Sequence, residues 1–119
     1  MIDHDAAEHS LPRAYLRPVV LLLVSEGPTH GYELLEEVRR VGIRLPDPGG
    51  LYRALRAMEH DGLLESWWEA SSSGPHRRTY VLTAIGQATL SVEIEAMRER
   101  IALLSKLVDH ADSFGLHRS

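Results

Sequence analysis

Residues 47–83 read DPGGLYRALRAMEHDGLLESWWEASSSGPHRRTYVLT, in which one helix pattern is followed by two strand patterns. Asp47 and Pro48 open the helix, because Asp is favoured at the N-cap and Pro at the first helical position. Apolar residues then recur at the spacing of one helix face, namely Leu51, Leu55 and Met58. We predict a helix that ends at about Asp61, before Gly62. Its other side carries three larger side chains: Tyr52, Arg53 and Arg56.

The hairpin pattern lies directly after this helix. Residues 64–70 partly alternate between apolar and polar side chains, and residues 79–82 are rich in β-branched and aromatic ones. Between them, residues 71–75 are Ser, Gly and Pro, which form turns, and the next three residues are basic: His76, Arg77 and Arg78. We therefore predict a two-stranded hairpin whose loop, residues 71–78, carries positive charge at its tip.

Two further helices are predicted upstream. Residues 16–25 are apolar on almost every side, which is typical of a buried helix, and Pro18 fits its first turn. Gly27 and Pro28 stop this helix. Thr29 is a good N-cap for a second helix over residues 30–41, in which an apolar face lies opposite a glutamate-rich one.

The residues after the hairpin predict one long amphipathic helix, which Thr83 caps. Its apolar residues alternate spacings of four and three: Leu90, Ile94, Met97, Ile101, Leu104, Val108 and Ala111. This is a heptad a/d seam, and Leu103 and Leu107 widen it. Such a seam exposes more apolar surface than one small domain covers, so we predict a homodimer through this helix. The alternative is that the helix folds back onto its own domain.

The distribution of charge matters more than its total. The formal net charge is −4, but residues 11–83 carry nine Arg against nine Asp and Glu, so the acidity lies outside the middle of the chain. Within that middle the arginines gather locally, at Arg39, Arg40, Arg44, Arg53 and Arg56 and again at Arg77 and Arg78. Local clustering governs the attraction of phosphate, so the net charge neither supports nor excludes nucleic-acid binding.

Three helices followed by a basic hairpin are the order of a winged helix-turn-helix, a mainly α fold with a small β-hairpin (α+β). An α-helix fits the major groove of B-DNA, and arginines one turn apart can pair with guanine. Glycines in the first turn let the backbone approach another surface, and a basic hairpin can reach phosphate or the minor groove. The expected partner is double-stranded DNA with an inverted-repeat operator. The predicted DNA-contacting residues are His30, Gly49, Gly50, Tyr52, Arg53, Arg56, His76, Arg77 and Arg78.

Composition is that of an ordinary globular protein with room for one domain and one appended element. There is no cysteine, and the apolar run at residues 19–24 is too short to cross a membrane. The first ten residues carry three acids and no Lys or Arg, unlike a secretory signal, so we expect a cytoplasmic protein. The expected parts are a disordered start at 1–10, the winged domain at 11–83, the dimerisation helix at 84–114 and a frayed tail at 115–119.

Several spaced blocks resemble the PadR family of transcriptional regulators, in its shorter branch with one C-terminal helix. They are His30-Gly31-Tyr32-Glu33-Leu34, Gly49-x-Leu51-Tyr52-x-x-Leu55, Met58-Glu59-x-x-Gly62-Leu63 and Gly74-x-x-Arg77-Arg78-x-Tyr80-x-Leu82-Thr83-x-x-Gly86. The resemblance implies a homodimeric winged-helix repressor that a small molecule releases from its operator. By position it makes residues 48–61 the recognition helix and residues 71–78 the wing. The chain departs from the family at Gly50, where Thr or Ser is common, and at Arg53, where Pro is common.

The adjacent tryptophans Trp67 and Trp68 face opposite sides of a strand. We predict that Trp68, in register with Leu64, packs on the core and that Trp67 is partly exposed. Two interpretations of Trp67 stay open. It packs against the C-terminal helix, or it lines a pocket for a small aromatic or hydrophobic effector with Met97 and Ile101 across the dimer interface.

Other chemistry finds no support in the sequence. The seven histidines lack the spacing of metal ligands, and His30 is better explained as a helix-start residue that hydrogen-bonds locally. The hairpin serines lack an activating pattern, and no phosphate-binding glycine loop is present. We predict no enzyme, no metal and no cofactor. Two alternatives to a DNA-binding regulator are a winged-helix module that pairs with another protein without meeting DNA, and a protein that sequesters a ligand.

Overall fold

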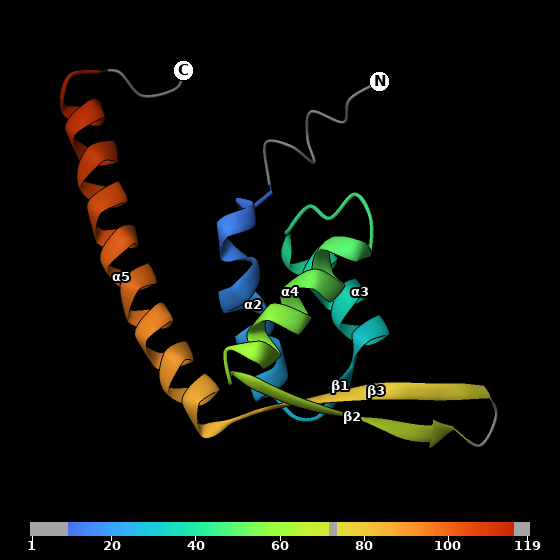
Figure 1. The fold of residues 1–119 in the computed structure, drawn as a ribbon. Coiled ribbons are helices and arrows are strands. Elements are labelled where there is room, and N and C mark those ends of the chain that lie inside the picture. The colour runs from blue at the N-terminus through green and yellow to red at the C-terminus, as the bar shows by residue number, and fades with distance from the viewer. Residues whose placement is uncertain (1–9, 72–73, 116–119) are drawn as a thin grey trace.

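The computed structural model describes residues 10–71 and 74–115, in which a cluster of helices packs on a small sheet and a long helix leads away from it (Figure 1). The elements in chain order are η1 (Arg13–Tyr15), α2 (Leu16–Ser25), β1 (Thr29–His30), α3 (Gly31–Val41), α4 (Gly49–His60), β2 (Leu64–Ser71), β3 (Gly74–Leu82) and α5 (Ala84–Ser113). The predicted fold class, mainly α with a small sheet, is confirmed. The disordered start and frayed tail lie, apart from Ser10 and Gly115, outside the described residues.

The sheet has three strands in the order β1-β3-β2, one more than the sequence predicted. β1 pairs antiparallel with β3 through Thr29 and His30. The predicted N-cap at Thr29 is therefore wrong, because the sheet uses this residue and the extended His30 caps α3 instead. Gly42 follows α3 in the left-handed conformation, with φ of 117°, which glycine adopts without strain.

β2 and β3 form a hairpin that extends past the helices (Figure 1). β3 begins at Gly74, so the loop predicted at residues 71–78 is wrong over residues 74–78. The three basic residues predicted for the loop therefore lie on strand β3, which pairs with β2: His76, Arg77 and Arg78. Favourable cross-strand pairs, such as Glu69 opposite Arg77, continue the ladder into this segment.

The core lies where α2, α3 and α4 meet the base of the sheet. Its fully buried side chains include Leu21, Leu34, Ile43, Leu51, Leu55, Met58 and Leu64. Three of these are the residues predicted for the inner face of α4, so that prediction is confirmed. The helix begins at Gly49, one residue later than predicted, and Pro48 is its N-cap.

Trp68 is not part of the core, so the prediction that it packs there is wrong. It is 61% exposed, more than Trp67 at 43%. Trp68 does lie on the side of the hairpin that faces α4, in register with the buried Leu64. At the position of Trp68, however, a concave surface lies between the hairpin and α4, so the ring is not covered as Leu64 is.

Close contacts fix the direction in which α5 leaves the sheet. Its N-cap Thr83 accepts a hydrogen bond from the Gly86 amide at 3.0 Å and donates one to the Gly62 carbonyl at 2.6 Å. Farther along α5, Arg100 donates to the Tyr15 hydroxyl at 2.9 Å. The helix is therefore tied to the domain at its start and again near its middle.

The predicted heptad seam lies in two different environments. Leu90 is buried and Ile94 packs against the core, so the first part of the seam folds onto its own domain. Met97 and Ala111 are half-buried. The exposed part consists of Ile101, Leu103, Leu104, Leu107 and Val108, which we call the apolar stripe. Among the described helices, α5 included, none combines the length and apolarity needed to span a membrane.

Candidate nucleic-acid interface

Helix α4 presents the residues predicted to read DNA on the side away from the core. Tyr52, Arg53 and Arg56 are exposed, whereas Leu51 and Leu55 behind them are fully buried. Within residues 10–71 and 74–115, neither arginine has a carboxylate partner within 4 Å. Two guanidinium groups one helical turn apart can therefore pair with an external phosphate or base edge.

The space beside the two glycines of α4 is filled by neighbouring side chains. A Cβ at Gly49 would lie 2.8 Å from Oδ1 of Asp47 and 2.9 Å from Nη1 of Arg53, and one at Gly50 would lie 2.4 Å from Nη2 of Arg13. Gly50 is buried, so the group that meets solvent there is the Arg13 guanidinium and not bare backbone. Sequence reasoning missed Arg13, because only the fold brings η1 to the start of α4.

A concave surface of about 370 Å³ lies between α4 and the hairpin. Its lining residues are Tyr52, Arg56, Glu59, Trp68, Arg78 and Tyr80. Three of the predicted contact residues, Tyr52, Arg56 and Arg78, therefore share one surface. Burial raises the pKa of the Tyr80 phenol, which keeps this group neutral. The surface combines the Arg56 guanidinium with aromatic rings, which suits the phosphates and sugars of a nucleic acid.

Arg77 and Arg78 differ in their surroundings although they are adjacent. Arg77 is exposed opposite Glu69, while Arg78 donates from Nε to the Ser66 hydroxyl at 2.9 Å. Arg78 also lies 3.7 Å from a carboxylate oxygen of Glu59 and stacks 5.3 Å above the Trp68 ring. Arg77 and the exposed His76 are thus presented to solvent, and Arg78 is engaged inside the protein.

His30 is surrounded by carboxylates and is only one-fifth exposed. Its Nδ1 lies 2.7 Å from Glu33 and its Nε2 lies 3.3 Å from Glu69, which also accepts a hydrogen bond from the Thr79 hydroxyl. The hydrogen bond from His30 lowers the pKa of Glu33. The pKa of Glu69 is lowered first by Thr79 and then by His30. His30 therefore makes the expected local hydrogen bond, to Glu33, and its contact with Glu69 also joins the start of α3 to the sheet.

We expect Glu33→Gln to destabilise the protein near neutral pH and not in strong acid. A carboxylate whose folded pKa is lowered contributes stability above its unfolded pKa and loses this contribution as the pH falls through the folded value. Urea unfolding of both chains at about pH 6 and about pH 3 measures the difference. Glu36→Gln, on the same helix, is the matched control. A deficit of equal size at both pH values would contradict the assignment.

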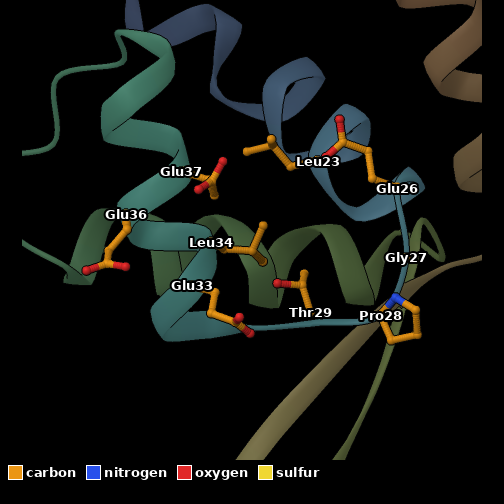
Figure 2. A pocket seen from close by; sticks show the side chains of 9 residues that line it. All are labelled: Leu23, Glu26, Gly27, Pro28, Thr29, Glu33, Leu34, Glu36 and Glu37. Carbon is orange, nitrogen blue, oxygen red and sulfur yellow. The ribbon is translucent and has the colours of Figure 1, made fainter.

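Glutamates gather in a separate hollow of about 320 Å³ at the junction of α2 and α3 (Figure 2). Its acidic members are Glu26, Glu33, Glu36 and Glu37. Such a surface repels phosphate, so the faces of the domain differ in electrostatic character. Among the described residues no group of three or more His, Asp or Glu is arranged to hold a metal ion.

An apolar groove of about 570 Å³ lies between α5 and the segment formed by η1 and α2. Met97 and Ile101, two of the residues predicted for an effector pocket, line it together with Leu104 at the start of the exposed apolar stripe. Trp67 lies on β2 opposite Thr79 and does not line this groove.

The chain matches the model of the transcriptional regulator PadR-like family over residues 20–92. It is 37% identical over 87 residues to transcriptional regulator Rv3488 of Mycobacterium tuberculosis. The aligned region covers 73% of this chain and 79% of that protein. Its fold is similar to a PadR family transcription regulator from Clostridium difficile, with a TM-score of 0.71, 25% identity and coverage of 79% of this chain and 98% of that one. It is also similar to a PadR family transcriptional regulator from Eggerthella lenta, with a TM-score of 0.67, 32% identity and coverage of 81% and 83%.

Proposed function

Because the chain belongs to the PadR-like family of transcriptional regulators, we propose that it acts in the cytoplasm as a homodimer on an inverted-repeat operator in double-stranded DNA. It is a transcriptional regulator and not an enzyme. The observation that carries the DNA-binding proposal is the exposed face of α4, where Arg53 and Arg56 have no carboxylate partner among the described residues.

In this proposal α4 enters the major groove and the hairpin follows the flanking backbone. Arg53 and Arg56 are placed to reach base edges, because they stand on the exposed centre of the helix. Arg77 and His76 are exposed on the hairpin and supply phosphate contacts. Arg13 adds a cation beside the start of α4.

The dimer is proposed from the apolar stripe of α5. Leucine and isoleucine side chains that are more than half exposed over successive helical turns are unusual on a monomer surface. A second copy of the same helix, seated against the stripe and the adjoining groove, would cover both. A two-fold pair also sets two α4 helices at the spacing of successive major grooves, as an inverted repeat requires.

Arg53→Ala is expected to weaken operator binding by about 1–3 kcal/mol per half-site and to relax the base preference at one position. Arg77→Ala should weaken binding to all duplexes alike and reduce the salt slope by about one unit per subunit. Fluorescence anisotropy with a duplex selected from a random pool, at several salt concentrations, measures both. Arg98→Ala is the control, since it removes the same charge at a position on α5, where Arg98 lies beside Glu95.

The same titrations distinguish the DNA-binding proposal from the alternative function. If the protein is an interaction module that never meets DNA, the selection returns no inverted repeat and the three variants are indistinguishable. That outcome would end the DNA-binding proposal, and capture of another protein through α5 would then have to be tested.

Release by a small molecule stays a prediction within this proposal. A small aromatic or hydrophobic effector would enter where Met97 and Ile101 line the groove, next to the proposed dimer contact. Because Trp67 does not line the groove, its fluorescence is a poor reporter of such binding. A shift in operator affinity on addition of the compound is the direct measurement.

A further inference from the structure

The residue that connects the hairpin to α4 is Glu59, which lies in the last turn of that helix. Its Oε1 accepts a hydrogen bond from the Ser66 hydroxyl at 2.7 Å, and Ser66 in turn accepts one from Arg78 Nε at 2.9 Å. The other carboxylate oxygen of Glu59, Oε2, lies 3.7 Å from Nη2 of Arg78. One carboxylate thus joins three elements, namely α4, β2 and β3.

This network is better protected from water than an ordinary surface pair. The side chains of Arg78 and Glu59 are 35% and 33% exposed, and the guanidinium also lies over the Trp68 ring. Ion pairs that share several hydrogen bonds and are partly withdrawn from solvent are stronger than isolated exposed ones. The hairpin therefore has a defined attachment to α4 at this point, although its outer part extends beyond the helices (Figure 1).

The network also sets Arg78 apart from the other arginines of the interface. Among the described residues, Arg53, Arg56 and Arg77 have no carboxylate within 4 Å, whereas a carboxylate oxygen of Glu59 lies 3.7 Å from Arg78. A guanidinium already held by a carboxylate is less available to phosphate. Phosphate contacts raise affinity for every DNA sequence alike, while base contacts provide the discrimination.

We propose that Glu59 is a positioning residue that holds Arg78 on Trp68, fixes the hairpin against α4 and withholds Arg78 from phosphate. The inference rests on the proposed DNA-binding function and adds to it a device that limits the sequence-independent part of the DNA affinity. Loss of the Glu59 charge frees Arg78 for a phosphate, so binding to random sequence and to the operator increases by about the same factor.

The first part of the test needs no DNA. Trp67→Phe leaves Trp68 as the single tryptophan, and acrylamide quenching then reports how far its ring is covered. Adding Glu59→Gln should increase the quenching of Trp68, whereas adding Glu65→Gln should not, because Glu65 is exposed and lies opposite Val81. Equal quenching in the Glu59 and Glu65 variants would overturn the positioning role.

The second part measures binding to a random-sequence duplex across a salt series. Glu59→Gln should bind more tightly and steepen the salt dependence by about one unit per subunit, and Glu65→Gln should leave the slope unchanged. In an Arg78→Ala background the gain from Glu59→Gln should vanish, which separates release of Arg78 from simple loss of a negative charge. A gain that persists without Arg78, or an unchanged slope, would overturn the proposal. If no variant binds any duplex, the proposed function fails, and the quenching result still decides whether Glu59 positions Trp68 and Arg78.

Discussion

A chain that carries Leu104→Glu is expected to be monomeric at concentrations where we propose that the natural chain is a dimer. Leu104 is 55% exposed in the single chain and lies on the apolar stripe with Ile101 and Val108. A two-fold interface contains each residue twice, so the change buries two carboxylates without partners, at about 3–5 kcal/mol each. Since about 1.4 kcal/mol corresponds to a tenfold change, the dimer dissociation constant should rise by about 10⁴-fold or more.

Sedimentation velocity over a range of protein concentrations measures this dissociation directly. Operator affinity should fall with it, by about 10²-fold or more, because two half-sites are no longer bound by one linked molecule. Val92→Glu is the matched control, since Val92 lies on the same helix, is 68% exposed and stands nine residues before Ile101, where the apolar stripe begins. A stable dimer in Leu104→Glu, or equal dissociation in Val92→Glu, would show that the two copies meet elsewhere.

The sequence predicts those features of the fold that depend on local spacing. Apolar periodicity predicts the inner face of α4, and the positions of Gly and Pro predict the ends of α2. The structure confirms both predictions. The length of β3 does not follow, because Gly74 and Pro75 favour a turn when they are taken alone. Pairing with β2 extends the strand through these residues, and such pairing depends on the partner strand.

Burial and partner choice are harder to predict, because they depend on where other elements end. Alternation places Trp68 on the side that faces α4, yet no local signal shows that a concave surface separates the hairpin from α4 there. The seam of α5 has one period throughout, although Leu90 packs on the domain and Leu104 does not. Arg13 and Glu59 are missed for the same reason, since each acts at a contact that only the tertiary structure creates.

Gly86→Ala is expected to destabilise the fold by about 2–3 kcal/mol, although alanine is the better helix former. A Cβ at this position would lie 2.2 Å from the Leu63 carbonyl oxygen and 2.7 Å from Cδ1 of Leu82. The nearer atom belongs to the backbone, so α5 must move away from Leu63, the residue before β2, and the Thr83 cap would be disturbed with it. Urea unfolding should show a lower midpoint with an unchanged m-value.

Gly50→Ala provides the matched control for this effect. The nearest atom to its Cβ is also too close, at 2.4 Å, but it is the end of the flexible Arg13 side chain, which can swing aside. Helix propensity then dominates, so this variant should be as stable as the natural chain or up to about 1 kcal/mol more stable. If the two variants are equally stable, the approach of α5 to Leu63 is not what requires glycine at position 86. If only Gly86→Ala is destabilised, this approach sets the angle at which α5 leaves the winged domain, and with it the separation of the two α4 helices in the proposed dimer.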